Sequence, residues 1–172
     1  MNKPLYTFFT QDHHRVESFL DKATKIPGEI NNDYYEKFRV GLLTHIKMEE
    51  KILFLAAQRA NNNVPLPIAG QLRLEHGALT ALLVPTPTLA IIKVIRYVLE
   101  RHDLAEEEPG GMYDACEHLT QSQTQEILEQ LHAVKEVPVH PHNDIPLAMQ
   151  AAKRALNRAG YDFDDIVALQ EE

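Results

Sequence analysis

Residues 45–50 read HIKMEE and residues 102–107 read HDLAEE, so each segment has a histidine with a glutamate four positions later. Two further segments resemble each other: residues 12–20 read DHHRVESFL and residues 75–83 read EHGALTALL. In both, an acid and a histidine precede apolar residues at helical spacing. The first 108 residues therefore contain one pattern twice, a histidine followed by His-x-x-x-Glu. A repeat that reproduces histidine and glutamate together is far harder to obtain by chance than a single motif.

The chain around this pattern reads as helical. Glycine is scarce, at 7 of 172 residues, and apolar residues recur every three to four positions almost throughout. Four long helices are expected over residues 4–25, 32–60, 67–84 and 88–108, separated by short segments that contain Pro, Gly or Asn. We therefore predict an all-α fold in which residues 1–111 form an up-down-up-down four-helix bundle.

The segment after Gly111 has a different character. A more polar fifth helix is expected over residues 112–137, an extended linker over 137–142, and a sixth helix over 144–159 that Gly160 ends. The acidic stretch 162–165 is expected to form one last turn. We treat residues 112–172 as a C-terminal helical extension that packs on the bundle or on a partner subunit.

The repeated histidines and glutamates lie on helix faces that should be buried. Each histidine shares a helical stripe with apolar residues, as His13 does with Phe9 and Val16. Glutamates occupy two of these stripes, and an unpaired buried carboxylate is costly unless a cation compensates it. We therefore predict a carboxylate-bridged two-metal site built by six residues, His13, His45, Glu49, His76, His102 and Glu106. Imidazole and carboxylate ligands suit iron, and also zinc or manganese, better than calcium or magnesium.

The pattern resembles that of the hemerythrin-like family, also described as HHE cation-binding domains. That family has a histidine on helix one, His-x-x-x-Glu on helix two, a histidine on helix three and His-x-x-x-Glu on helix four. The matching residues are His13, His45 with Glu49, His76, and His102 with Glu106, within residues 1–110. The resemblance implies a bundle with two iron ions, bridged by both glutamates, with or without an oxo or hydroxo bridge. It also implies open coordination positions for a small ligand such as oxygen.

The chain departs from the oxygen-carrying hemerythrins. Those proteins have a fifth histidine on helix three, where this chain has Thr80, and an Asp on helix four at a spacing not used here. This difference favours oxygen, nitric oxide or redox sensing, iron homeostasis or stress protection over reversible oxygen transport. Two other hypotheses stay open: a di-iron enzyme that activates oxygen or peroxide, and a metal-free helical interaction module. We predict no catalytic residue, because no nucleophile–base arrangement or phosphate loop is visible.

The overall composition excludes several partners. A formal net charge of −8 argues against nucleic acid, because no net basic surface exists to release counterions. A lone Cys116 can form neither an internal disulfide nor a thiolate zinc site. The N-terminus has no secretory pattern, and Pro85, Pro87 and Lys93 interrupt the most apolar region. We therefore expect a cytoplasmic protein without membrane contact, either a monomer or a homodimer.

The other residues that could bind a metal are expected to lie outside the site. Glu17 is a weaker candidate ligand. Asp12 and Glu75 could orient neighbouring histidines, although their spacing favours exposure. The remaining histidines and acids read as solvated helix-surface or linker residues: His14, Glu50, Glu107, Glu108, Glu117, His118, His132, Glu136, His140 and His142.

Overall fold

The computed structural model describes residues 2–169, and every regular element in that range is helical, which confirms the all-α class. The elements are α1 (Pro4–Ala23), α2 (Asn32–Met48), the π-helical turn η1 (Glu49–Leu53), α3 (Phe54–Ala60), α4 (Ala69–Leu82), α5 (Leu89–Glu107), α6 (Met112–Leu119), the 3-10 turn η2 (Gln121–Gln123), α7 (Thr124–His132), α8 (Pro146–Ala159) and α9 (Phe163–Ala168). Among these residues no helix is long and apolar enough to cross a bilayer.

The helix ends follow local chemistry. The Asn31 side chain caps α2 by accepting a hydrogen bond from the backbone N–H of Tyr34, and Thr88 caps α5 in the same way. These side chains satisfy N–H groups that have no partner within the helix. Gly160 ends α8 in the left-handed region, with φ of 91°, as the sequence predicts. The long helices therefore begin and end close to where the sequence places them.

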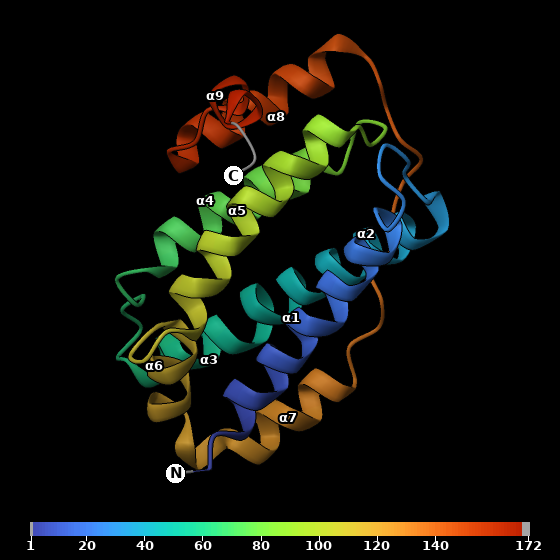
Figure 1. Ribbon diagram of the computed structural model, residues 1–172. Helices are drawn as coiled ribbons and strands as arrows, with labels where there is room; N and C mark the ends of the chain where they lie inside the picture. Colours follow the sequence, from blue (N-terminus) through green and yellow to red (C-terminus); the bar gives the residue numbers. More distant parts are fainter. Residues whose placement is uncertain (1, 170–172) are drawn as a thin grey trace.

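The helices pack in pairs. Helix α1 packs against α2 and α4 against α5, while α8 lies along α4 and α9 against α5 (Figure 1). Helix α6 contacts α1, α3 and α5, and α7 lies beside α1. The C-terminal extension therefore packs on helices of its own chain, at both ends of the molecule.

The single fifth helix predicted over residues 112–137 is wrong. Helix α6 ends at Leu119, and the chain turns at Thr120, whose hydroxyl donates to the Cys116 carbonyl 2.8 Å away. After η2, the shorter α7 buries Ile127 and Leu131 and ends at His132. One straight helix could not place the buried residues of both α6 and α7 against the rest of the molecule. This packing outweighs the helix propensity of the intervening polar residues.

The buried apolar residues form two separate clusters. Phe9 belongs to one cluster and Val16 to the other, and His13 lies between them on α1. The same alternation occurs on α2, α4 and α5, where apolar residues of the two clusters flank the other three histidines. The core therefore contains a polar layer between two apolar halves, and this layer is where the predicted metal site falls.

Candidate metal centre

All six predicted ligands lie together in this polar layer. Each is buried, and Glu49 and Glu106 have no solvent exposure at all. Their donor atoms form two groups, each with all atoms within 4.8 Å of one another. Group one is defined as His13, His45, Glu49 and Glu106, and group two as Glu49, His76, His102 and Glu106. Both groups thus share the two glutamates, and each group contains residues from both helical pairs.

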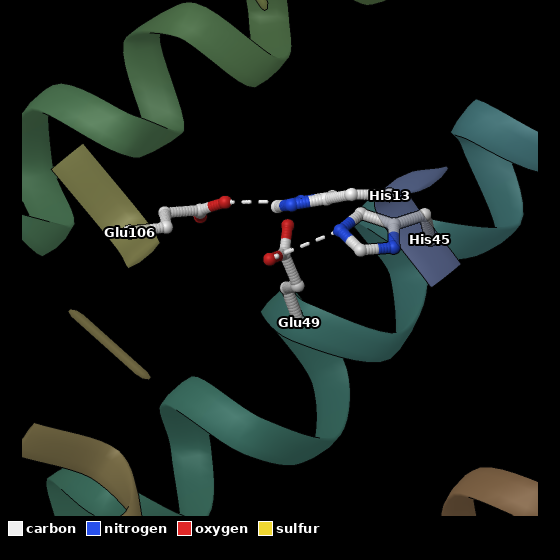
Figure 2. A group of neighbouring side chains, drawn as sticks. All are labelled: His13, His45, Glu49 and Glu106. Carbon is white, nitrogen blue, oxygen red and sulfur yellow. Dashed lines mark ion pairs between the residues drawn. The ribbon is translucent and has the colours of Figure 1, made fainter. Parts of the chain in front are cut away.

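Each glutamate gives one oxygen to each group. In group one, His13 Nε2 lies 3.3 Å from Glu106 Oε2, and His45 Nε2 lies 3.2 Å from Glu49 Oε1 (Figure 2). In group two the other oxygens approach the second histidine pair. Glu49 Oε2 lies 3.0 Å from His76 Nε2, and Glu106 Oε1 lies 3.4 Å from His102 Nε2. The two carboxylates therefore span two adjacent groups, as bridging ligands do.

The spacing of the donor atoms is compatible with a bound metal ion. Ligand atoms bound at about 2.0–2.2 Å from one ion lie roughly 3 Å or more from each other. Glu49 Oε2 and Glu106 Oε1 are buried and have no hydrogen-bond partner among the described residues. Buried carboxylate oxygens need a positive charge nearby, which a protonated histidine or a bound cation can supply. Each buried group could therefore hold a metal ion, and its donors suit iron, zinc or manganese.

Each of the four grouped histidines has a carboxylate on its Nδ1 atom. The Nδ1 atoms lie 2.6–2.8 Å from carboxylate oxygens in four pairs: His13 with Glu107, His45 with Asp12, His76 with Glu50, and His102 with Glu75. An ionised carboxylate can only accept, so Nδ1 carries the proton. In a neutral imidazole this leaves the Nε2 lone pair directed at the site, the usual arrangement around a metal. The expectation that these four acids are exposed helix-surface charges was therefore wrong.

The carboxylate partners cross between helices in a regular way. Asp12, beside His13, holds His45 of the same helical pair, and Glu75, beside His76, holds His102. Glu50 and Glu107, each next to a bridging glutamate, hold the histidine of the opposite pair. The two halves of the centre are thus related by an approximate two-fold relationship, which matches the repeat in the sequence.

Burial and charge act in opposite directions on the histidines. Burial alone would lower the pKa of His45, but Glu49 and Asp12 outweigh it and raise that pKa to about 9. Burial opposes protonation of His76 as well, and Glu49 and Glu50 raise its pKa to about 10. The nearby acids also raise the pKa values of His13 and His102 against the effect of burial. Without metal, the layer is therefore held together by buried ion pairs between imidazolium and carboxylate groups.

Tyr113 is a site residue that the sequence did not reveal. Its hydroxyl oxygen lies 2.9 Å from His13 Nε2, 2.5 Å from Glu49 Oε1 and 2.9 Å from Glu106 Oε2. Burial and the two glutamates raise the pKa of Tyr113 far above its ordinary value, so its hydroxyl keeps its proton in the absence of a cation. The phenol oxygen sits among the donor atoms of group one and is a candidate fifth ligand there. Among residues 2–169 no tyrosine hydroxyl is hydrogen-bonded to His76 or His102 of group two.

A tight turn brings Tyr113 back to the centre. A Cβ added at Gly111 would lie 2.7 Å from the Ala105 carbonyl oxygen, so only glycine fits where α6 begins against the end of α5. The Gly110-Gly111 pair was a visible signal of a turn in the sequence. The direction of α6 after that turn was not.

The second unexpected local feature is the π-helical turn that begins at Glu49 itself. In this turn the backbone N–H of Phe54 donates to the Glu49 carbonyl, five residues back. Such turns occur frequently at functional sites, because they shift the faces of the following helix relative to the preceding one. Here the turn presents Glu49 to the centre while Leu53 and Phe54 remain buried in the apolar cluster.

A small cavity adjoins group one, and Tyr113 does not line it. It is lined by apolar side chains and by His13, Glu17, His45, His102 and Asp103, and its volume for a water-sized molecule is about 10 Å³. That is room for about one such molecule. Burial raises the pKa of Asp103 to about 6, and its Oδ1 lies 3.7 Å from His13 Nε2. A wider open groove of about 690 Å³ along α1 and α5 also reaches Asp103 and Glu107.

Most of the residues expected outside the site do lie outside it. His14, His118, His132 and His140 are exposed, as are Glu108 and Glu136, and Glu17 belongs to neither group. Glu117 is a correction, because it is buried and accepts hydrogen bonds from the backbone N–H groups of Leu5 and Tyr6. It thereby caps the start of α1. Cys116 is fully buried, and burial raises the pKa of its thiol.

No known protein family, curated protein or solved structure matches the chain. The interpretation of the centre therefore rests on its own geometry. The described residues define an all-helical protein with two adjacent, buried His–carboxylate groups that could hold metal ions.

Proposed function

We propose that the chain is a hemerythrin-like protein in which α1, α2 with α3, α4 and α5 form a four-helix bundle around two iron ions. The observation that carries this proposal is the sharing of Glu49 and Glu106 between two histidine pairs. His13 and His45 would hold one ion, and His76 and His102 the other. When bound, the ions supply Lewis acidity and redox chemistry. A cytoplasmic location is part of the proposal.

The surroundings support a role in sensing a small molecule or in iron homeostasis and stress protection. The cavity beside group one has room for about one water-sized molecule, so it suits oxygen or nitric oxide rather than an organic substrate. Its apolar wall of Val16, Leu42 and Leu99 favours a neutral ligand. Four carboxylates accept hydrogen bonds from the Nδ1 atoms of the histidines, namely those of Asp12, Glu50, Glu75 and Glu107. They fix the imidazoles and make them more basic ligands, which stabilises bound iron.

A di-iron enzyme acting on peroxide is the second candidate, and Asp103 is the observation that favours it. This half-buried acid lines the cavity with its Oδ1 3.7 Å from His13 Nε2, so it lies where it can exchange a proton with a ligand bound there. Peroxide consumption by the iron-loaded protein distinguishes the two candidates. Steady turnover supports the enzyme, whereas a single stoichiometric spectral change supports the sensor or homeostatic role.

Metal content tests the proposed function directly. We expect His45→Ala and His102→Ala each to lose bound metal, because each removes a ligand from a buried group. The exposed His14 and His132 provide matched controls, and His14→Ala and His132→Ala should keep full metal content. The measurement is elemental analysis of untagged protein purified without added metal. Equal metal content in all four variants, or no bound metal in the wild type, would contradict the proposal.

Tyr113 gives a spectroscopic prediction. Next to a bound cation the phenol should ionise, and a phenolate bound to ferric iron absorbs visible light. We expect Tyr113→Phe to keep both ions but to lose this absorption in aerated, iron-loaded protein. Tyr6→Phe is the matched control, since the Tyr6 hydroxyl donates to the Glu107 backbone carbonyl and its ring packs edge-on against Tyr113. Identical visible spectra for wild type and Tyr113→Phe would show that the phenol is not a ligand.

A further inference from the structure

The C-terminal extension contacts Glu75, the carboxylate that is hydrogen-bonded to His102 of group two. The Tyr161 hydroxyl, just after α8, donates to Glu75 Oε1 over 2.7 Å. Gln71 Nε2 lies 2.9 Å from the same oxygen and 2.8 Å from the Ala159 carbonyl oxygen at the end of α8. The other oxygen, Glu75 Oε2, lies 2.7 Å from His102 Nδ1. A continuous chain of short polar contacts therefore runs from the end of α8 to a histidine of group two.

The corresponding contact in group one is built differently. Asp12 holds His45 there, and its other oxygen accepts from Arg15 Nε over 2.8 Å, one turn along the same helix. No residue of the extension takes part in that contact. The approximate two-fold relationship of the centre thus breaks at this point. The Glu75 carboxylate that holds His102 is contacted by the segment 146–168, whereas the Asp12 carboxylate that holds His45 is contacted by Arg15 of its own helix.

Residues 146–168 are docked on the rest of the molecule by polar as well as apolar contacts. Helix α8 packs on α4 mainly through small side chains, since Ala152, Ala155 and Ala159 are buried there beside Leu156. Alanine side chains bury little apolar area, and so contribute little free energy each. The segment is further held by Lys93, which donates to the carbonyls of Val167 and Leu169. The contact of Tyr161 with Glu75 therefore joins the packed segment 146–168 directly to the buried polar layer.

We propose that docking of residues 146–168 is coupled to metal occupancy of group two through Tyr161, Glu75 and His102. Tyr161 is a positioning residue, because it and Gln71 both donate to Glu75 Oε1. Glu75 Oε2 then accepts from Nδ1 of His102, and the Nε2 atom of His102 faces group two. An ion in group two restrains His102 and Glu75 and so favours the docked segment. Coupling between binding equilibria is reciprocal, so docking raises the affinity of group two for metal by the same factor. This inference rests on the proposed metal binding.

The test is Tyr161→Phe, which keeps the ring and removes only the hydroxyl. Anaerobic titration with ferrous iron should show about tenfold weaker binding of the ion in group two and unchanged binding of the ion in group one. A loss of this size is typical when a residue that supports a metal-bound histidine is removed. Hydrogen exchange of residues 146–168 should slow on metal loading in the wild type. In Tyr161→Phe, loading should leave it unchanged. Arg15→Ala is the mirror control, because it removes the partner of Asp12: it should weaken the other ion and preserve the response of the segment.

Three outcomes would overturn the coupling. Wild-type protein that binds two ions with no change in exchange of residues 146–168 would overturn it and leave the proposed function standing. Equal weakening of both ions in Tyr161→Phe would show a general loss of structure instead of a contact with group two. Failure of the wild type to bind any metal would overturn both the coupling and the proposed function.

Discussion

We expect Glu49→Gln and Glu106→Gln each to lose both bound metal ions, not one. Each glutamate gives one oxygen to each group, so a single change removes a charged ligand from both ions. Glutamine keeps the size of the side chain but removes the negative charge. Glu136→Gln is the matched control, because Glu136 also follows a histidine by four residues but is exposed. Elemental analysis and calorimetric titration measure the result, and retention of one ion would show that the carboxylates do not bridge.

The same variants should lose metal-dependent stability. At a free metal concentration a hundredfold above Kd, each ion stabilises the native state by about 2.7 kcal/mol. For two ions in a domain of this size, Tm should fall by roughly 10–20 °C when metal is lost. A chelator should therefore lower the Tm of the wild type by this amount and leave the Tm of Glu49→Gln unchanged. A wild-type Tm that does not respond to chelator would contradict the expectation.

The second large effect is a reversal of pH dependence on metal loading. In the metal-free protein, carboxylate neighbours raise the pKa of His45 to about 9 and of His76 to about 10, against the effect of burial. The ordinary value is about 6.5. These histidines therefore stabilise the fold fully below about pH 6.5, and that stabilisation is lost as the pH rises toward 9 and 10. For His45 the loss amounts to about 3 kcal/mol.

Metal binding should follow the opposite trend over the same range. An imidazole must release its proton before its Nε2 can bind a metal, so apparent affinity rises with pH. Loading both ions at pH 7 should release several protons, from the protonated histidines and from the Tyr113 phenol, which ionises beside a bound cation. Denaturant midpoints between about pH 6.5 and 9 should therefore fall for chelated protein and rise for loaded protein. Calorimetry in buffers of different ionisation enthalpy counts the protons, and parallel pH profiles for both forms would contradict the prediction.

The helical class and the six grouped residues were predictable because they depend on periodicity within single helices. A histidine and a glutamate four positions apart share one face whatever the helix packs against. The hydrogen bonds from the histidines to Asp12, Glu50, Glu75 and Glu107 were not predictable by the same reasoning. Asp12 does point away from its neighbour His13, as helical geometry requires, but it reaches His45 on the next helix. Spacing along one helix contains no information about the side chains that an adjacent helix presents.

Tyr113 and the π-helical turn were missed for a related reason. Tyr113 lies outside the repeated motif, and its position depends on how closely the backbone approaches α5 at Gly111. The π-helical turn leaves no mark in composition, because residues 49–53 also suit an ordinary α-helix. Both features depend on tertiary packing. They add to the centre a donor and a change of helical register that the repeat itself does not encode.

The position of Glu106 determines when the centre can first be completed. Both groups contain this residue, and it lies in the last turn of α5. Since a growing chain is synthesised from its N-terminus, neither group is complete until all four long helices have been made. His13, His45 and Glu49 alone offer an ion an incomplete and solvent-accessible set of ligands. Under the proposed function, neither ion could be fully bound before α5 has joined the fold.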